Sequence, residues 1–299
     1  MKACASVQRA ALTGCSNLHL RIDTLVDLAL EEDTGFGDIT SQAIFSSDHV
    51  SQAQIVARED LVVCGLEVAK RVFCRVDPSV VVDLVARDGD RVNEEETVLR
   101  AEGSTISLLT AERTALNFLQ RLSGIATLSR RFADAAKKSE SGVRVVDTRK
   151  TTPGWRALEK NAVRSGGCFN HRSSLGEHVL IKENHIAAAG SLQEAVKRAR
   201  AFAPHCSKIE VEAESLHEVG EAVKCGAEII MLDNMSPAQI RQAVALIDKA
   251  AIVEISGGVR LETFADYALP GVDVISVGAL THSAPAANLN MTMATQSEK

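Results

Sequence analysis

The second half of the chain repeats one short unit, an apolar strand followed in most cases by a helical segment. The strand-like pieces are rich in valine and isoleucine, and in chain order they read VRVVD, HVLIK, KIEVE, EIIMLD, AIVEIS and VDVISVG. Helical patterns separate several of them, at residues 191–202, 216–224 and 237–250. Repeated strand and helix units form a parallel sheet with right-handed crossovers. This half is therefore predicted to be either an open, doubly wound sheet or a βα barrel.

The residues at the strand ends favour one of these two folds. Every strand ends in, or is directly followed by, a residue able to take part in binding or catalysis. In chain order these are Asp147 with Arg149 and Lys150, then Lys182, Glu212, Asp233, Ser256 and Gly278. A single residue of this kind would usually only meet solvent. Its recurrence over the whole repeat indicates a βα barrel, in which the carboxyl ends of the strands carry the active site.

The residues expected on this rim point to anionic ligands. Cations outnumber what a structural network of ion pairs needs, which indicates a substrate with several carboxylates or phosphates. They are Arg149, Lys150, His171, Arg172 and Lys182. Glu212 and Asp233 could hold Mg²⁺ directly or through water, because this ion prefers oxygen ligands. Small residues after the last two strands predict a phosphate site made of backbone amides: Ser256, Gly257, Gly258, Gly278 and Ala279.

The first half of the chain has a different pattern. Strands are expected at residues 53–60, 80–92 and 96–104, where β-branched residues recur and Asp-Gly or Glu-Gly turns separate the runs, as in an antiparallel sheet. Helices are expected at residues 66–74 and 107–138, and another at 22–30 with Asp23 as its N-cap.

Composition and charge narrow the class of protein. The net charge of −6 argues against a nucleic-acid partner or a membrane surface. No run of about 18 apolar residues is present for a membrane span, and the first residues make a poor secretory signal, while a transit peptide stays open. The seven cysteines are scattered without a CxxC pair, which indicates reduced thiols in the cytoplasm. Cys168 is expected to be a small filler, and the charged run that includes Lys160 and Arg164 fits a solvated helix face equally well.

The linked order of motifs resembles one family. GDIT and TAERTALNFLQRLSGIAT are followed by DTRKTTPGWR, EKNAVRSGGCFNHR, VLIKENH, IEVE, MLDN, EISGG and VGALTHSAP. Over about residues 20–290 they resemble quinolinate phosphoribosyltransferase, the carboxylating nicotinate-nucleotide pyrophosphorylase. The resemblance implies a type II phosphoribosyltransferase fold with an N-terminal extension (1–20), an α/β sandwich domain (21–140) and an incomplete α/β barrel (141–283). A C-terminal segment (284–299) would pack back on the first domain.

The reaction that this resemblance implies joins quinolinate to phosphoribosyl pyrophosphate with Mg²⁺, and gives nicotinate mononucleotide, pyrophosphate and carbon dioxide in NAD synthesis. The implied catalytic residues are Lys150, Lys182, Glu212 and Asp233, the last two facing the ribose and the metal. The acid would be bound by Arg149, His171, Arg172 and Lys182, and the phosphate by Ser256, Gly257, Gly258, Gly278 and Ala279. A homo-oligomer, either a dimer or a trimer of dimers, would share Arg113 between subunits.

Two other functions stay open at this level. A related type II phosphoribosyltransferase could act on a different aromatic acid such as nicotinate, although that acid has one carboxylate and the cations present suffice for two. A barrel kept only as a phosphate sensor would be expected to lose its acidic pair, and Glu212 and Asp233 are present.

Overall fold

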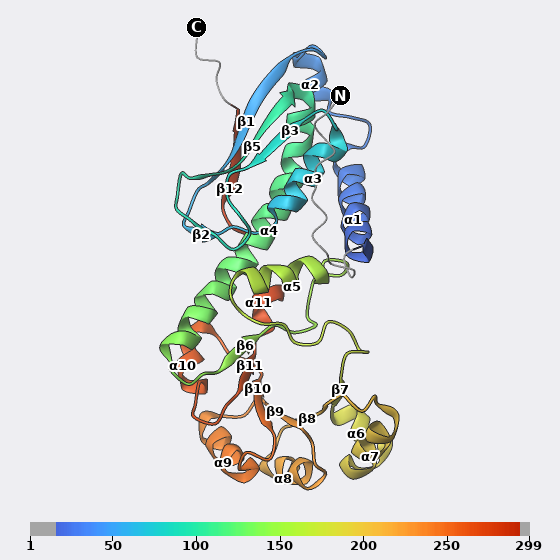
Figure 1. Cartoon of the computed structure of the whole chain (residues 1–299), viewed down its shortest axis with the longest axis vertical. Helices are drawn as coiled ribbons and strands as arrows, with labels where there is room; N and C mark the ends of the chain where they lie inside the picture. Colours follow the sequence, from blue (N-terminus) through green and yellow to red (C-terminus); the bar gives the residue numbers. More distant parts are fainter. Residues whose placement is uncertain (1–15, 294–299) are drawn as a thin grey trace.

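The computed structural model describes residues 16–293, with side chains from residue 22 onward. Most of the expected N-terminal extension, up to residue 15, and the last six residues of the chain lie outside the described residues. Two domains follow one another along the long axis of the molecule, and a single long helix, α4 (Thr105–Lys138), runs through both (Figure 1).

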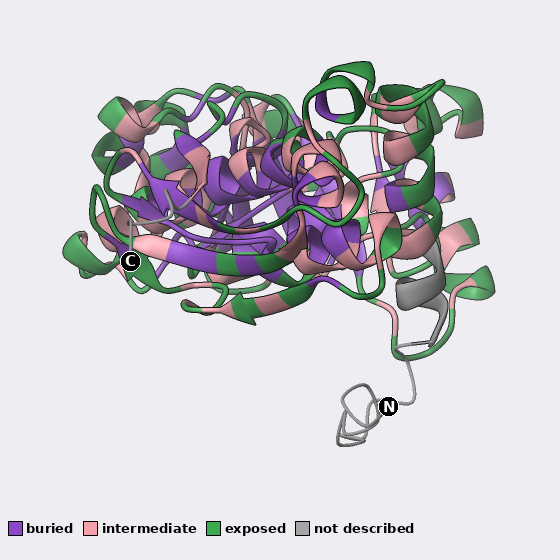
Figure 2. Ribbon diagram, turned by 90° about the horizontal axis from the view of Figure 1, so that it is seen from above, coloured by how far each residue is buried: buried purple, intermediate pink, exposed green. Residues whose placement is uncertain are grey.

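The first domain is built on an antiparallel sheet of four strands in the order β12, β1, β5, β3. The strands are β1 (Val50–Ala57), β3 (Val81–Leu84), β5 (Thr97–Ser104) and β12 (Leu289–Met293). The helices α3 (Leu66–Val76) and α4 pack on this sheet, and α1 (Ser16–Thr34) packs on both of them; α2 (Ile39–Ile44) lies against α4. Viewed from above, the buried residues lie between these helices and the sheet (Figure 2).

The apolar spacing of α4 explains how it holds the domain together. Its buried residues recur three and four positions apart, as in the series Leu108, Ala111, Ala115, Leu119 and Leu122. This spacing places them on one face of a helix. That face packs against α3 and the sheet in the first domain, while the later turns of the same helix pack against the barrel.

Two expectations for the first domain are wrong. Asp23 does not cap a helix, because α1 already begins at Ser16, and the Asp23 carboxylate instead accepts a hydrogen bond from Arg71 at 2.5 Å. The stretch 80–92 is not one strand, because Gly89, with φ +99°, makes a turn inside it. Beyond this turn, β4 (Arg91–Val92) pairs with β2 (Leu61–Val62) in a separate small ribbon.

The second domain is a barrel of six parallel strands in the order β6, β11, β10, β9, β8, β7. They are β6 (Arg144–Val146), β7 (Val179–Ile181), β8 (Ile209–Ala213), β9 (Ile229–Asp233), β10 (Ile252–Ser256) and β11 (Val274–Ser276). Within the described residues the end strands β6 and β7 do not pair, so the barrel is open on one side. The fold class predicted from the sequence, an α/β sandwich domain followed by an open α/β barrel, is confirmed.

Helices connect and cover the strands of the barrel. They are α5 (Arg156–Ser165), α6 (Glu183–Ala189), α7 (Leu192–Phe202), α8 (Leu216–Lys224), α9 (Pro237–Ile247), η1 (Leu261–Thr263), α10 (Phe264–Tyr267) and α11 (Ala279–His282). Three of them are preceded by an N-cap serine whose hydroxyl accepts an amide hydrogen bond from the first turn: Ser191, Ser215 and Ser236. Such caps fix where a helix starts. In the described part of the chain, no helix has both the length and the apolar content to cross a bilayer.

The chain returns to the first domain after the barrel. β12 pairs with β1 in antiparallel fashion, with Thr292 opposite Gln54. On the way, residues 284–288 cross α4, where the Gln120 carbonyl accepts a hydrogen bond from the Ala287 amide at 2.9 Å. One turn further along the helix, Gly124 lies directly beneath the crossing segment. A Cβ atom at this position would lie 1.9 Å from the carbonyl oxygen of Pro285.

We expect Gly124→Ala to destabilise the protein, because the added Cβ would clash with the Pro285 carbonyl and the crossing backbone is held by its hydrogen bond to α4. The cost should be about 1 to 3 kcal/mol of the free energy of unfolding, as for other overpacked sites. The matched control is Gly220→Ala in α8, whose Cβ would meet only a Leu246 methyl at 3.7 Å. There the better helix propensity of alanine should keep or raise stability. Equal unfolding midpoints for both variants in denaturant titrations would contradict the close crossing.

Candidate active site

The residues predicted at the strand ends meet in one cavity at the carboxyl end of the barrel. Its volume is about 350 Å³, and it is called the rim cavity below. The expected residues that line it are Arg149, Lys150, His171, Arg172, Lys182, Glu212, Asp233 and Ser256. Each comes from a strand end or from the loop behind it, so the parallel arrangement of the strands brings together residues that are far apart in the sequence.

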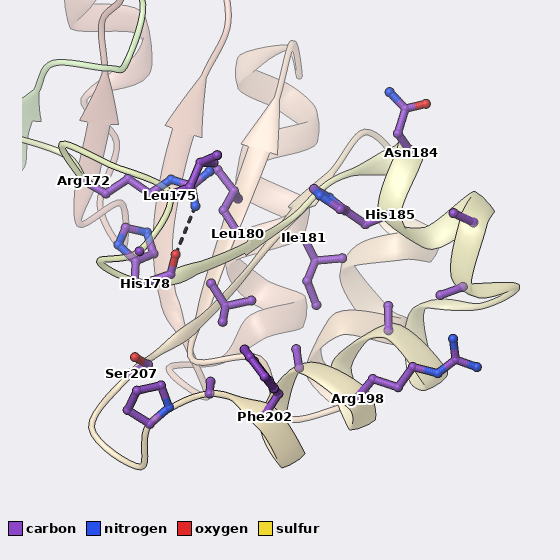
Figure 3. Close-up of a pocket in the computed structure, with 18 residues that line it drawn as sticks. Arg172, Leu175, His178, Leu180, Ile181, Asn184, His185, Arg198, Phe202 and Ser207 are labelled. Atoms are coloured by element: carbon purple, nitrogen blue, oxygen red, sulfur yellow. Dashed lines mark hydrogen bonds between the residues drawn. The ribbon is translucent and has the colours of Figure 1, made fainter. Parts of the chain in front are cut away.

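Arg149 and Arg172 face this cavity without enough counter-charge. The Nε atom of Arg149 is buried and has no hydrogen-bond partner in the described structure. Arg172 is 9 % exposed, and one guanidinium nitrogen donates to the His178 carbonyl at 3.0 Å (Figure 3). Burial and the neighbouring Arg149 both lower the pKa of Arg172. Two guanidinium groups that are close together and partly dehydrated repel each other, so the binding of a dianion between them is favourable.

His171 is fixed by partners on both ring nitrogens. Its Nδ1 accepts a hydrogen bond from the Arg172 backbone amide at 2.8 Å, so the ring in this structure carries its proton on Nε2. Nε2 lies 3.4 Å from a carboxylate oxygen of Glu210 and 3.4 Å from one of Glu254, both inside the barrel. Burial opposes a charge on the ring, but hydrogen bonds to these carboxylates outweigh it and raise the pKa of His171 to about 9. Full protonation of the ring, which this pKa favours at neutral pH, would require Nδ1 to lose the hydrogen bond from the Arg172 amide.

The acidic pair lines the same cavity as the arginines. Glu212 forms an ion pair with Lys182, and Asp233 accepts a hydrogen bond from the side chain of Asn234 at 2.7 Å. Among the described residues, these two acids do not belong to a cluster of three metal-binding side chains. Two carboxylates fit Mg²⁺, which keeps several waters and takes further oxygens from a phosphate-bearing substrate. Because the Glu212 carboxylate is already paired with Lys182, these two acids are better suited to contact Mg²⁺ through water than directly.

The glycine segments lie just beyond the lining of this cavity. Gly257 and Gly258 follow β10 with φ of +94° and +66°, a region that other residues rarely adopt. A Cβ on Gly257 would lie 2.2 Å from the side-chain oxygen of Asn234, so only glycine fits there. After β11, a Cβ on Gly278 would lie 3.3 Å from the side chain of Lys150. Ala279 follows as the first residue of α11.

Two other candidates lie away from the cavity of their own chain. Arg113 is exposed on the first-domain part of α4 and does not line this cavity. Cys168 is buried, and its thiol donates to the Ser129 carbonyl at 3.1 Å. Burial raises the pKa of Cys168 to about 12, so it is held as a thiol and fills space, as expected.

Four residues of the cavity were missed in the sequence: Thr148, Leu180, Met231 and Ser276. Ser276 is the last residue of β11, so the strand-end rule that found Ser256 could have found it too. Thr148 lies inside the motif DTRK. Leu180 and Met231 lie within strands and carry no polar signal, so only the folded barrel shows that they face the ligand cavity.

A second and larger cavity, of about 680 Å³, lies outside the barrel along β7, α6 and α7 (Figure 3). Most of its lining is apolar, and it includes Leu175 and Phe202, which are 70 % and 93 % exposed. It shares only Arg172 and Leu180 with the rim cavity. Since it holds few polar groups that converge, the larger cavity is not the place for the chemistry of a polyanionic substrate.

An open parallel barrel that gathers cations and a pair of acids at its carboxyl rim is the architecture of a βα-barrel enzyme for anionic substrates. Comparison with known proteins then defines the family. Residues 38–123 match the quinolinate phosphoribosyl transferase N-terminal domain and residues 125–292 match the C-terminal domain of the same family. The chain belongs to the quinolinate phosphoribosyl transferase family, which confirms the resemblance in the motifs.

Individual relatives cover nearly the whole chain. A probable nicotinate-nucleotide pyrophosphorylase [carboxylating] of Bacillus subtilis is 40 % identical over 94 % of this chain and 96 % of its own length. A mitochondrial quinolinate phosphoribosyltransferase [decarboxylating] of Nicotiana glauca is 38 % identical over 91 % of this chain and 82 % of its own. The crystal structure of NadC from Streptococcus pyogenes superposes with a TM-score of 0.86 at 42 % identity, covering 92 % of this chain and 98 % of that one.

Proposed function

We propose that this protein is a quinolinate phosphoribosyltransferase, which converts quinolinate and phosphoribosyl pyrophosphate to nicotinate mononucleotide, pyrophosphate and carbon dioxide in NAD biosynthesis. The observation that carries the proposal is the rim cavity, which is lined by Arg149 and Arg172 together with Glu212 and Asp233. Two guanidinium groups with little counter-charge suit an acid with two carboxylates. Relatives at about 40 % identity over most of the chain bear the name of this activity.

In this mechanism the cations of the rim first offset the repulsion between two polyanions. Arg149, Arg172 and Lys182 hold the carboxylates of quinolinate, and His171 completes that wall of the cavity. Ser256 with Gly257 and Gly258, and Gly278 with Ala279, hold the phosphate of the second substrate through hydroxyl and amide groups. Positioning of this kind supplies most of the rate, because both reacting atoms are brought together in a fixed geometry.

The bond changes follow from this placement. The pyridine nitrogen attacks C1 of the ribose as the bond to pyrophosphate breaks, and charge on the leaving group is neutralised by Lys150. Glu212 and Asp233 face the ribose, where positive charge develops. The nitrogen of the product ring is then positively charged, so the electron pair left when the C2 carboxylate departs as carbon dioxide is stabilised, and a proton takes its place on C2.

Magnesium is part of the proposal. When bound, Mg²⁺ would neutralise charge on the pyrophosphate of the substrate, and Glu212 and Asp233 are the residues that would hold it, directly or through water. Both line the rim cavity and offer oxygen donors, which supports this assignment. Removing the ion with a chelator is expected to stop turnover.

We also propose that the enzyme works in the cytoplasm as a homo-oligomer, a dimer or a trimer of dimers, in which Arg113 enters the site of a neighbouring subunit. The exposed position of Arg113, outside the cavity of its own chain, supports this. So do the open side of the barrel and the exposed apolar residues Leu175 and Phe202 beside it. Placing the first domain of one chain over the barrel of another would close the site against water.

An assay of three acids tests the function. Quinolinate, nicotinate and orotate are each incubated with phosphoribosyl pyrophosphate, with and without Mg²⁺, and carbon dioxide and pyrophosphate are measured. We expect product from quinolinate only when both the second substrate and Mg²⁺ are present, because only a dianion satisfies the cations of the cavity. Turnover of nicotinate with equal kcat/KM would overturn the proposal and favour a related phosphoribosyltransferase.

A further inference from the structure

A buried ion pair behind the cavity has no role in the mechanism above. Lys160 of α5 is 4 % exposed and its ammonium group pairs with Asp147, which is 0 % exposed and directly follows β6. Lys160 therefore neither belongs to a solvated helix face nor lines the rim cavity. A buried ion pair is seldom retained for stability alone, because the cost of removing two charges from water offsets most of their attraction.

The Asp147 carboxylate takes the place of a backbone carbonyl at the end of a short ladder. Residue Phe169 runs beside β6 in parallel: its amide donates to the Val145 carbonyl at 2.9 Å, and the Asp147 amide donates to the Phe169 carbonyl at 3.1 Å. In a regular parallel ladder the next bond would join the His171 amide to the backbone carbonyl of Asp147. Here the His171 amide donates instead to the carboxylate oxygen Oδ1 of Asp147, at 2.9 Å.

Lys160 holds His171 through the backbone carbonyl of that residue. Besides the Asp147 carboxylate, its ammonium group donates to the His171 carbonyl at 2.8 Å. With the Asn170 amide oriented so that its nitrogen faces the carboxylate, this nitrogen donates to Asp147 Oδ2 at 2.9 Å and to the Lys160 carbonyl at 3.1 Å. The backbone amide and carbonyl of His171 are thus both held by hydrogen bonds to the ion pair. Arg172 is the next residue of the chain.

We propose that Asp147 and Lys160 are positioning residues for quinolinate: together they fix the backbone of residues 170–172, so that Arg172 enters the cavity beside Arg149. This inference rests on the proposed function, since it assigns the acid substrate to these arginines. The pair is separate from the groups proposed to hold the phosphate, because Ser256 ends another strand, β10, and Gly257 and Gly258 follow it. The pair should therefore act on one substrate and not on the other.

The test compares Lys160→Met with the double variant Lys160→Met/Asp147→Asn. Lys160→Met leaves the buried Asp147 carboxylate unpaired, so this variant should be less stable and should also lose the fixed position of residues 170–172. In the double variant the charge is gone, and the side-chain amide oxygen at position 147 can still accept from the His171 amide, so stability should return. The bond to the His171 carbonyl stays absent in both.

We expect both variants to raise KM for quinolinate by about tenfold to 100-fold, because a misplacement of about 1 Å can cost a factor of up to about 100. KM for phosphoribosyl pyrophosphate should stay within about twofold of the wild type, since the phosphate segments keep their supports. Equilibrium binding of quinolinate, measured by calorimetry without the second substrate, should weaken in parallel. Unfolding midpoints show which variant is stable enough to interpret.

Two results separate failure of this inference from failure of the proposed function. If the wild-type protein neither binds nor converts quinolinate, the proposed function is wrong. If the wild type does so, but the double variant recovers both stability and wild-type KM for quinolinate, the pair is only structural and the inference is overturned. Equal increases in KM for both substrates would also overturn it.

Discussion

Arg149→Ala is expected to weaken quinolinate binding by about 2 to 5 kcal/mol, the cost of removing one member of a desolvated charge pair. This corresponds to a dissociation constant about 30-fold to about 4000-fold higher. The reason is geometric as well as electrostatic, because the buried Nε of Arg149 has no protein partner and a guanidinium can bind a carboxylate through two parallel bonds. Calorimetric titration of the variant with quinolinate measures the loss directly.

Arg144→Ala is the matched control for this experiment. Arg144 begins the same strand, β6, but lies at its other end, where its guanidinium stacks over the Phe169 ring at 5.4 Å, outside the rim cavity. Quinolinate binding should be unchanged in this variant. If Arg149→Ala binds quinolinate as well as Arg144→Ala does, with both folds intact, the carboxylate site lies elsewhere.

Mixing two inactive variants should restore activity if subunits share their sites. We expect Arg113→Ala and Lys182→Ala each to be inactive, because each removes a cation from the acid-binding wall. When the two chains are denatured and refolded together, both lesions of a hybrid dimer can fall in one site and leave the other intact. With equal mixing, half of the dimers are hybrids, so the preparation should regain about a quarter of wild-type activity in a symmetric dimer.

Lys182→Ala mixed with Arg149→Ala provides the negative control. Both residues line the cavity of their own barrel, so each site of a hybrid still lacks one of them and no activity should return. Native mass spectrometry confirms that hybrids form in both mixtures. Hybrids of the first pair without activity would show that Arg113 serves its own barrel or no site at all.

The rim was predictable from the sequence because the rule behind it depends on topology alone. Parallel strands direct their carboxyl ends to the same edge, so Lys182, Glu212 and Asp233 could be brought together before any side-chain contact was known. The helix at residues 107–138 could be expected from the periodic pattern of its apolar residues. The repeated strand and helix units predicted a parallel sheet, while the open form of the barrel was implied by the resemblance in the motifs.

Other parts of the site depend on contacts that no local pattern reveals. Lys160 belongs to a charged run that equally fits a solvated helix, and only the packing of α5 behind β6 shows that it is buried against Asp147. Leu180 and Met231 look like any strand residue. In the sequence, Gly124 is only a residue with low helix propensity. The close crossing of residues 284–288 shows why a glycine is needed there.

The pairing of β12 with β1 has a consequence for how the protein is made. The sheet of the first domain is not complete until residues 289–293 join Ala53–Ala57, so the barrel is inserted between two parts of one folding unit. Domains usually fold in the order in which the ribosome delivers them. Here the domain that is translated first is finished last, and until then β1 exposes an unpaired edge that other chains could join.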